Sequence, residues 1–466
     1  MDIKLDHDTI CAIATPVGEG GIGIVKLSGP DSLPIIRGLF QPDRPVDSYR
    51  SHQLYHGWII DPVSRESVDE VLMSFMSAPH TYTRDDVVEI NCHSGYMVLN
   101  RILELVLQAG ARLAEPGEFT RRAFLNGRID LSQAEAVLDV IHARSEQSLL
   151  VAGRHLRGDF REAVFACREA LLRLLSEIEA HIDFAEDLEG EGMDRASTWM
   201  RELQQELIAP LERMLANYRQ GRILREGLTL VLLGKPNVGK SSLLNVLVGR
   251  DRAIVTPYPG TTRDVIEDSL LIEGITVRIL DTAGIREEPD DIESMGIQRA
   301  LSSITEADAA LWLIDRSRPL TDEDDAVFEA IGSTEHIVLL NKSDLHPAVS
   351  FADVREKYST SAPVVAISVF HSGDVARLLE MIASRYLRRP LEVSHSALVP
   401  NLRQKARFEG ALDALHRAGE LLRGAGRDEL VSLEFQTARK HLDGILGIEI
   451  EDDLLDRIFS EFCIGK

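Results

Sequence analysis

The sequence predicts a multidomain α/β and α+β protein, in which a doubly wound, mostly parallel sheet is inserted into a helical domain. Residues 1–127 mix short strand-like apolar runs with turn signals. Apolar residues at helical spacing dominate 128–222 and again 388–466. Between these segments, residues 223–387 alternate strand and helix patterns, and 466 residues are enough for about three domains.

The first segment is predicted to be an α+β domain. Short β-like runs predict strands at 22–27, 70–75 and 87–90. Residues 98–107 have helical periodicity instead.

The helical segments are predicted from one buried stripe between residues 132 and 183. Its positions are Leu149, Leu156, Phe160, Val164, Leu171, Leu174, Leu175, Ile178 and Ile182. The acidic, glycine-containing stretch 186–192 is interpreted as a solvated connection, and a helix is expected at 196–219. After Pro390, helices are expected at 402–422 and 429–462.

Composition limits the classes of function. The formal net charge of −24, from 51 basic and 75 acidic residues, argues against a broad nucleic-acid-binding surface, although a local basic patch remains possible. The cysteines are too few and too scattered for a disulfide framework or a zinc site; they are Cys11, Cys92, Cys167 and Cys463. With neither a secretory leader nor a membrane-length apolar run, the sequence predicts a soluble, cytoplasmic protein.

The central segment contains a glycine-rich motif between a strand and a helix. Continuous apolar runs predict buried strands at 228–233, 277–280, 310–314, 337–340 and 364–367. The motif Gly-Lys-Pro-Asn-Val-Gly-Lys-Ser at 234–241 follows the first strand, which is the context of a phosphate-binding loop (P-loop). Backbone N–H groups of such a loop surround phosphates, Lys240 reaches the β and γ phosphates, and Ser241 binds Mg²⁺. The predicted contacts are Asn237, Val238, Gly239, Lys240, Ser241 and Ser242. A structural glycine turn is the alternative.

Later motifs favour nucleotide binding and identify the base. Asp-Thr-Ala-Gly at 281–284 follows the strand 277–280; Asp281 would bind Mg²⁺ through water and Gly284 would approach the γ phosphate. Asn-Lys-Ser-Asp at 341–344 follows the strand 337–340, and a carboxylate there accepts both N–H groups on the edge of guanine. Thr262, in Gly-Thr-Thr-Arg-Asp at 260–264, would complete the Mg²⁺ shell. Further predicted GTP contacts are Thr282, Ala283, Asn341, Lys342 and Asp344.

The residue that places the attacking water is not evident from these motifs. Ile285 follows the Asp-Thr-Ala-Gly motif, where Ras-like enzymes have glutamine, and an apolar side chain cannot orient water. The acidic candidates downstream are Glu287, Glu288, Asp290, Asp291 and Glu293. Arg263 and Arg286 are candidates for an arginine finger or ordinary surface residues.

Taken in order, these motifs resemble those of bacterial translation-associated GTPases. The stretches 8–16 and 116–126 and the Cys-Ile-Gly-Lys motif at 463–466 are similar to the family of tRNA modification GTPases called MnmE or TrmE. The resemblance covers essentially the whole chain. It implies a GTPase domain at 223–387 inserted into a helical domain of two parts, 128–222 and 388–466. It also implies an α+β tetrahydrofolate-binding and dimerisation domain at 1–127.

The resemblance implies catalytic groups in the GTPase domain. In the family, K⁺ beside the phosphates does the charge work of an arginine finger. Its ligands would be Asn237, Thr256, Tyr258 and Thr261. The loop that carries the last three also contains the predicted GTP contacts Pro257, Pro259 and Gly260. The domains dimerise across this loop, and Glu293 would orient the attacking water, with Lys240 on the phosphates.

For the first domain, the resemblance implies a site for a one-carbon tetrahydrofolate. Its residues would be Lys26, Glu89, Arg128 and Lys466, for which ordinary surface charge is the alternative. Many relatives have Arg at the first of these positions and Lys at the third, and the two side chains differ in geometry. Cys463 is either a small apolar group or a thiol in the modification reaction. Ser-Val-Phe at 368–370 departs from the family's Ser-Ala-Lys or Ser-Ala-Arg, which bears on guanine affinity.

The resemblance implies a K⁺-dependent GTP hydrolase that works with a flavin-containing partner, MnmG or GidA, which carries FAD. Together they would install a (carboxymethyl)aminomethyl group at position 5 of the wobble uridine of certain tRNAs, with glycine and ammonium both open as amine donors. The alternative is a GTP-dependent ribosome-assembly or RNA-binding switch protein. Such a protein would carry an appended basic RNA-binding domain, and the sequence shows none.

Overall fold

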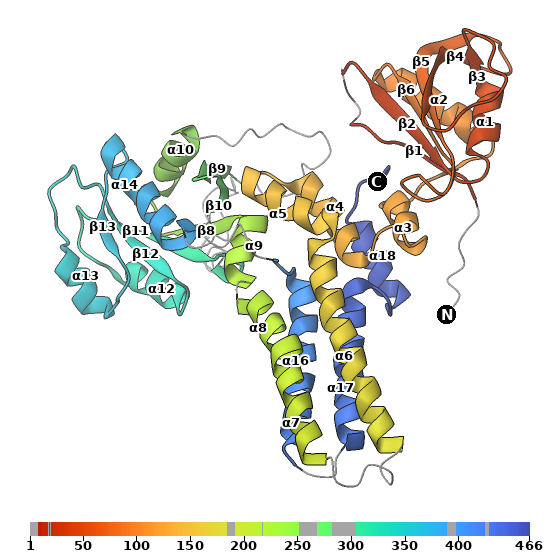
Figure 1. Ribbon diagram of the computed structural model, residues 1–466. Helices are drawn as coiled ribbons and strands as arrows, with labels where there is room; N and C mark the ends of the chain where they lie inside the picture. Colours follow the sequence, from red (N-terminus) through yellow and green to blue (C-terminus); the bar gives the residue numbers. More distant parts are fainter. Residues whose placement is uncertain are drawn as a thin grey trace. The chain divides into compact units, whose positions relative to one another are not determined.

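The computed structural model describes residues 8–16, 18, 20–183, 192–216, 218–250, 268–281, 304–388, 398–424 and 428–466 (Figure 1). The chain divides into two compact units. The first comprises Met1–Leu138, His155–Leu207 and Glu409–Lys466, and the second comprises Asp139–Arg154 and Ile208–Phe408. None of the helices over the described ranges has both the length and the apolar character that a membrane span requires.

A seven-stranded sheet begins the first unit, with the order β3-β4-β5-β6-β2-β1-β7. The strands are β1 (Ile10–Ile13), β2 (Gly23–Ser28), β3 (Phe40–Pro42), β4 (Gln53–Ile60), β5 (Ser67–Met76), β6 (Val87–Cys92) and β7 (Arg112–Leu113). All neighbours are antiparallel except the parallel pair β1–β7. The helices α1 (Ser32–Leu39) and α2 (Tyr96–Gln108) bury apolar faces in one core with the strands. The predicted strands and helix of this domain are confirmed.

The helices of the first unit pack along their apolar stripes. Those that lie wholly within it are α3 (Glu118–Leu125), α6 (Asp159–Asp183), α7 (Gly192–Glu202), α17 (Asp428–Leu446) and α18 (Asp452–Ser460). Helices α4 (Leu131–His142) and α16 (Leu402–Leu422) each have residues in both units. Helix α5 (Glu146–Arg157) begins in the second unit and ends in the first. The α6 part of the predicted stripe is buried from Phe160 to Ile178, and α17 lies beside it (Figure 1).

Three expectations for the helices were wrong in detail. Leu149 and Leu156 are exposed, because Gly158, with φ +103°, separates α5 from α6 and resets the helical phase. The helix expected at 196–219 is interrupted by a π-helical turn at Leu203–Ile208 before α8 (Ala209–Ala216) and α9 (Tyr218–Glu226). Pro210 has no backbone N–H for the regular ladder, which accounts for a break here. The connection expected at 186–192 lies mostly outside the described residues.

The third of these differences is at the end of the chain, where one helix was expected from 429 to 462. Helix α17 ends at Leu446 and α18 begins at Asp452. Gly447 between them has φ +77°, and a Cβ there would be 2.8 Å from the Phe124 ring and 2.9 Å from Leu131. The chain therefore turns against α3 and α4 at a position that only glycine fits.

The second unit contains a six-stranded sheet of order β13-β12-β11-β8-β10-β9. The strands are β8 (Leu228–Leu233), β9 (Asp268–Ile272), β10 (Ile275–Asp281), β11 (Ala309–Asp315), β12 (His336–Asn341) and β13 (Val364–Ala366). Only β9 is antiparallel to its neighbour. This is the predicted, mostly parallel sheet.

Helices cover both faces of this second sheet. Alternate residues of β8 enter different cores: Leu230 and Leu232 pack with α10 (Lys240–Arg250) and α14 (Ser372–Ile382), whereas Val231 and Leu233 pack with α12 (Asp322–Ile331) and α13 (Phe351–Tyr358). Figure 1 shows α14 and α12 on opposite sides of the strands. The doubly wound arrangement follows because fully buried parallel strands need apolar partners on both faces.

Candidate functional site

The loop between β8 and α10 has a backbone that only glycine can follow at two positions. Gly234 has φ +148°, and a Cβ there would be 2.5 Å from the Leu313 carbonyl oxygen. Gly239 has φ +104°, and a Cβ there would be 2.3 Å from Asn341 Nδ2. The predicted glycine-rich loop is therefore held closely against β11 and β12, with the N-terminus of an eleven-residue helix directly after it.

Lys240, the first residue of α10, crosses back over this loop. Its Nζ donates to the carbonyl oxygens of Gly234 at 2.7 Å and Lys235 at 3.1 Å. The loop's carbonyls thus hold the ammonium group against the loop, whose backbone N–H groups are the ones that bind phosphate oxygens in P-loops. Ser241, the proposed Mg²⁺ ligand, follows it in the first turn of α10.

The motif after β12 is bonded directly to the same loop. Asn341, which is 1% exposed, donates from Nδ2 to the Val238 carbonyl at 2.7 Å. Lys342 donates from Nζ to the Asn237 carbonyl at 3.0 Å and to Asp315 Oδ2 at 2.7 Å. The structure thus brings together the two motifs that were predicted to contact phosphate and base.

Two carboxylates are important for the motif at 341–344: Asp315 lies beside it, and Asp344 is its last residue. Burial acts to raise the pKa of Asp315, but hydrogen bonds from Lys342 and Ser317 outweigh it and hold the pKa below its usual value. Asp344, the predicted acceptor for guanine, is exposed at the carboxyl end of β12. The segment after β13 lies beside it, since Ser343 N–H donates to the Ile367 carbonyl at 3.0 Å.

The exposed residue at the end of this segment is Phe370, which is 84% exposed. It is the third residue of the Ser-Val-Phe departure, whose first residue, Ser368, is buried and accepts from the Phe370 N–H at 3.3 Å. The departure therefore puts an aromatic ring on the surface close to the base-recognition motif.

Many of the residues predicted to contact GTP, Mg²⁺ or K⁺, and the glutamate predicted to orient water, lie outside the described residues. These predicted residues are Thr256, Pro257, Tyr258, Pro259, Gly260, Thr261, Thr262, Thr282, Ala283, Gly284 and Glu293. The backbone of Asp281 is described: it ends β10 and is in register with Leu232, one residue before the end of β8. Over the described ranges, no group of three or more His, Cys, Asp or Glu side chains is placed to hold a metal ion.

The residues predicted for folate gather in the first unit. Lys26 on β2 and Glu89 on β6 are register partners. Lys26 Nζ is 4.8 Å from the centre of the Tyr82 ring and 4.9 Å from that of Phe119. The guanidinium of Arg128 is 4.7 Å from the Tyr82 ring centre. We call Lys26, Tyr82, Glu89, Phe119, Arg128 and Lys466 the N-terminal polar cluster.

The charged members of the cluster affect the ionisation of Lys26. Burial lowers the pKa of Lys26, and the negative charge of Glu89 opposes that effect. The positive charges of Lys466 and Arg128 lower the pKa of Lys26 further. Sequence reasoning missed Tyr82 and Phe119, because nothing local marks an aromatic residue as the neighbour of a distant lysine.

The terminal Cys-Ile-Gly-Lys motif is hydrogen-bonded to the start of α3 and lies close to β1. Phe119 N–H donates to the Lys466 carbonyl at 3.1 Å, and Gly117 N–H donates to the Cys463 carbonyl at 3.4 Å. Gly465 has φ +95°, and a Cβ there would be 2.8 Å from the Ile13 carbonyl oxygen. Cys463 is exposed, whereas the other cysteines are buried. The motif therefore fixes the backbone of Lys466 to Phe119 of the N-terminal polar cluster and leaves the Cys463 residue exposed.

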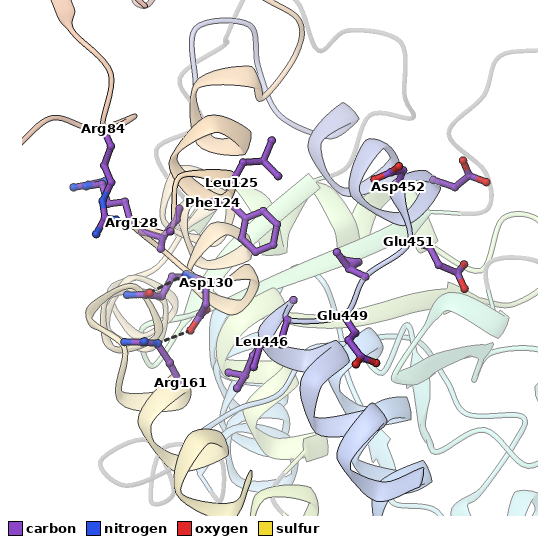
Figure 2. Close-up of a pocket in the computed structure, with 17 residues that line it drawn as sticks. Arg84, Phe124, Leu125, Arg128, Asp130, Arg161, Leu446, Glu449, Glu451 and Asp452 are labelled. Carbon is purple, nitrogen blue, oxygen red and sulfur yellow. Dashed lines mark hydrogen bonds and ion pairs between the residues drawn. The ribbon is translucent and has the colours of Figure 1, made fainter. Parts of the chain in front are cut away.

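A cavity of about 1120 Å³ opens next to Arg128 (Figure 2). Arg84, Arg128 and Arg161 line one side, and Glu449, Glu451 and Asp452 line the other. Asp130 lies on the same side as the arginines, with its Oδ2 3.2 Å from Arg161 Nε. Burial raises the pKa of Asp130 although Ser132 and Gln133 bond to it. Walls of opposite charge give this cavity no single preferred ligand charge.

Comparisons with known proteins identify the family. The family model for the MnmE helical domain matches residues 131–463, and that for the N-terminus of the GTP-binding protein TrmE matches residues 9–128. The tRNA modification GTPase MnmE of Syntrophobacter fumaroxidans is 60% identical over 470 residues, which cover 100% of both chains. The chain belongs to the MnmE family. MnmE of Moorella thermoacetica is 44% identical over 98% of this chain and 99% of that protein.

Membership of the MnmE family makes this chain a GTPase of tRNA modification and favours that function over the ribosome-assembly alternative. Among solved structures, Era of Aquifex aeolicus bound to GDP and AlF4⁻ is 28% identical, with 40% of this chain and 66% of that chain covered and a TM-score of 0.28. The predicted fold class, a P-loop GTPase domain within an MnmE helical domain after a TrmE-type N-terminal domain, is confirmed.

Proposed function

We propose that this MnmE protein is a K⁺-dependent GTP hydrolase that acts with a flavin-containing partner on tRNA. The pair would install a (carboxymethyl)aminomethyl group at position 5 of the wobble uridine. The observation that carries this proposal is the N-terminal polar cluster: its charged residues Lys26, Glu89, Arg128 and Lys466 come from distant parts of the chain and lie close together. The exposed Cys463 is three residues from Lys466 in the sequence. A GTPase that served only as a switch would not need such a cluster.

The loop 234–241 is the proposed phosphate site. Its glycines allow the loop to lie against β11 and β12. Lys240 would move from the loop carbonyls to the β and γ phosphates, and Ser241 would bind Mg²⁺. Thr262 would complete the Mg²⁺ shell, with Asp281 acting through water. Asp344 would accept both N–H groups of guanine, which adenine does not offer.

Potassium is the proposed activating cation. Asn237 would hold it beside the phosphates, together with Thr256, Tyr258 and Thr261 from the opposite loop. A cation there supplies positive charge where negative charge develops during phosphoryl transfer. Dimerisation of two GTPase domains would close this loop over the nucleotide. Hydrolysis that is as fast in Na⁺ as in K⁺ would remove Asn237 from this role.

The N-terminal polar cluster fits a one-carbon tetrahydrofolate. The Glu89 carboxylate suits the N–H edge of a pterin, and Lys26, Arg128 and Lys466 suit the carboxylates of the glutamate tail. The rings of Tyr82 and Phe119 add flat apolar surface for the ligand's rings. Tetrahydrofolate would supply the carbon. Cys463 is proposed to take part in the modification reaction.

The partner would be MnmG (GidA) with its FAD, in a hetero-oligomer with a homodimer of this chain. The net charge of −24 supports a division in which the partner supplies much of the tRNA-binding surface. GTP hydrolysis would drive a conformational change between GTPase domains and would not itself form the carbon–carbon bond. A cytoplasmic location suits a tRNA substrate.

Mass spectrometry of wobble uridine tests this function. Cells lacking this protein should accumulate unmodified uridine in the substrate tRNAs, and the gene for the unchanged chain should restore the modification. Genes for Cys463→Ser and Lys240→Ala should not restore it. Full modification in cells that lack the protein would refute the proposal.

A further inference from the structure

An ion pair joins the phosphate-binding loop to α12 within the second unit. Lys235 Nζ donates to Asp324 Oδ2 at 2.7 Å and to Thr321 Oγ1 at 3.2 Å. Only 12% of the Lys235 side chain is exposed, and none of the Asp324 side chain is. The same Asp324 oxygen accepts from the Thr321 N–H at 2.9 Å, which forms the capping box of α12. The loop is therefore bound to the capped end of a helix 89 positions further along the chain.

Lys235 is the cation that balances this fully buried carboxylate. The second oxygen of Asp324, Oδ1, is also buried and has no hydrogen-bond partner in the described part of the chain. Removing one partner of a buried ion pair leaves an uncompensated charge, which costs far more than removing both. Asp324 therefore depends on Lys235 for its charge balance.

The backbone of Lys235 also helps to hold the Lys240 side chain, because the Lys235 carbonyl accepts a hydrogen bond from Lys240 Nζ at 3.1 Å. On its other side, the loop is bonded through Asn237 and Val238 to the motif after β12. Lys235 thus connects the loop to α12, and Asn237 and Val238 connect it to the motif at the end of β12. Figure 1 shows α12 beside β11 and β12.

We propose that Lys235 is a positioning residue for nucleotide binding, which neutralises Asp324 and holds the loop without contacting the phosphates. The inference rests on the proposed binding of GTP phosphates by the loop 234–241. When Lys235 alone is removed, an unpaired carboxylate remains close to a loop that must accept an anion, so GTP and GDP both bind more weakly. When both charges are removed, this repulsion disappears.

The test is a titration of full-length variants with N-methylanthraniloyl-GDP, together with steady-state GTP hydrolysis. For Lys235→Met, we expect Kd and KM to rise about tenfold and kcat to change less than about twofold, because bound substrate and transition state lose the same interaction. The double variant Lys235→Met/Asp324→Asn should recover most of the lost affinity. Lys235→Arg keeps the charge pair and should bind as the unchanged protein does.

The adjacent residue of α12 provides a matched control. Asp325 pairs with Lys357 at 2.6 Å, with 39% and 38% of the two side chains exposed. Asp325→Asn should therefore leave nucleotide Kd within about twofold. Lys240→Ala tests the loop assignment itself, and normal nucleotide binding by that variant would refute the proposed phosphate site.

Two results would overturn the role of Lys235 while leaving the phosphate site standing. One is a folded Lys235→Met that binds nucleotide as tightly as the unchanged protein. The other is a double variant that is as weak as Lys235→Met, which would mean that Lys235 contacts the phosphates directly. If Lys235→Met does not fold, the double variant and Lys235→Arg decide the matter, since weak binding by both would contradict the charge-balance role.

Discussion

Lys26 and Glu89 lie directly opposite each other on the neighbouring antiparallel strands β2 and β6. Lys26 also lies near two aromatic rings, with its Nζ 4.8 Å from the centre of Tyr82 and 4.9 Å from that of Phe119. An acid and a base are thus held side by side with flat apolar surface. This combination matches a ligand that has N–H groups, carboxylates and aromatic rings.

Replacing Glu89 should weaken folate binding without affecting GTP hydrolysis. Glu89→Gln keeps the shape of the side chain but removes the charge, and a hydrogen bond to a charged group contributes about 1.5–3 kcal/mol. We expect the Kd for 5-formyltetrahydrofolate, measured by calorimetry on the full chain, to rise roughly tenfold to a hundredfold. The control is Glu70→Gln, since Glu70 is on the same sheet but outside the cluster. Equal loss in both variants would contradict the assignment.

The ion pairs around Arg112 and Arg122 predict a loss of stability in acid. Glu118 accepts from Arg112 at 2.7 Å and from Arg122 at 2.9 Å, and Asp8 accepts from the same two arginines. Burial acts to raise the pKa of both carboxyls, but the arginines outweigh it and hold both pKa values below their usual range. Such carboxyls stabilise the fold above their usual pKa, and this contribution disappears as pH falls through the lower, folded pKa.

The melting temperature should therefore decrease below about pH 4. Glu118→Gln should melt about 4 °C lower at pH 7 and lose part of this acid dependence, because the remaining arginine charges are no longer balanced. Glu104→Gln, which removes a 57% exposed partner of Arg101, is the control and should melt within about 1 °C of the unchanged protein. An unaltered acid profile in Glu118→Gln would exclude the network as the cause.

Gly465→Ala should release the terminal motif from β1. The added Cβ would be 2.8 Å from the Ile13 carbonyl, and φ +95° is unfavourable for alanine. We expect weaker binding of 5-formyltetrahydrofolate, since Lys466 moves away from the N-terminal polar cluster, with unchanged GTP hydrolysis. Gly38→Ala is the control, because a Cβ at that position meets nothing within 4 Å. Normal folate binding by Gly465→Ala would show that Lys466 is not needed there.

Glu293→Ala should keep GTP affinity but lose most hydrolysis, because the carboxylate is proposed to orient the attacking water and not to bind the nucleotide. The measurement is single-turnover hydrolysis in K⁺ beside a nucleotide titration. We expect a rate loss of about a hundredfold or more. The neighbouring Asp291→Ala serves as the control. Unchanged turnover in Glu293→Ala would mean that another acid places the water.

The strands of the GTPase domain could be predicted because their residues are compatible with few other kinds of structure. All of β8 and β11 is buried, and a short, continuous apolar run between turn signals fits a strand buried on both faces. The motifs at 234–241 and 341–344 follow strands β8 and β12, so the parallel sheet brings them to one edge. Local sequence was enough because the chemistry is at the strand ends.

Local sequence was not enough where distant residues determine the structure. The turn at Gly447 depends on contact with Phe124, and Tyr82 joins the cluster through Lys26 and Arg128. The partner of Lys235 is equally distant, since Asp324 looks like one more acid at the start of an acidic helix. Such pairings depend on tertiary packing, which cannot be predicted from the spacing of apolar residues or from a local motif.

The attachment of Lys466 to α3 also imposes an order of events during protein synthesis. Ribosomes add Lys466 long after Lys26, Glu89 and Arg128 have left the exit tunnel. A nascent chain that has grown only as far as the GTPase domain lacks the Lys466 carbonyl that accepts from the Phe119 N–H, and with it the Lys466 side chain. The N-terminal polar cluster is therefore complete only after the nucleotide-binding domain has been translated.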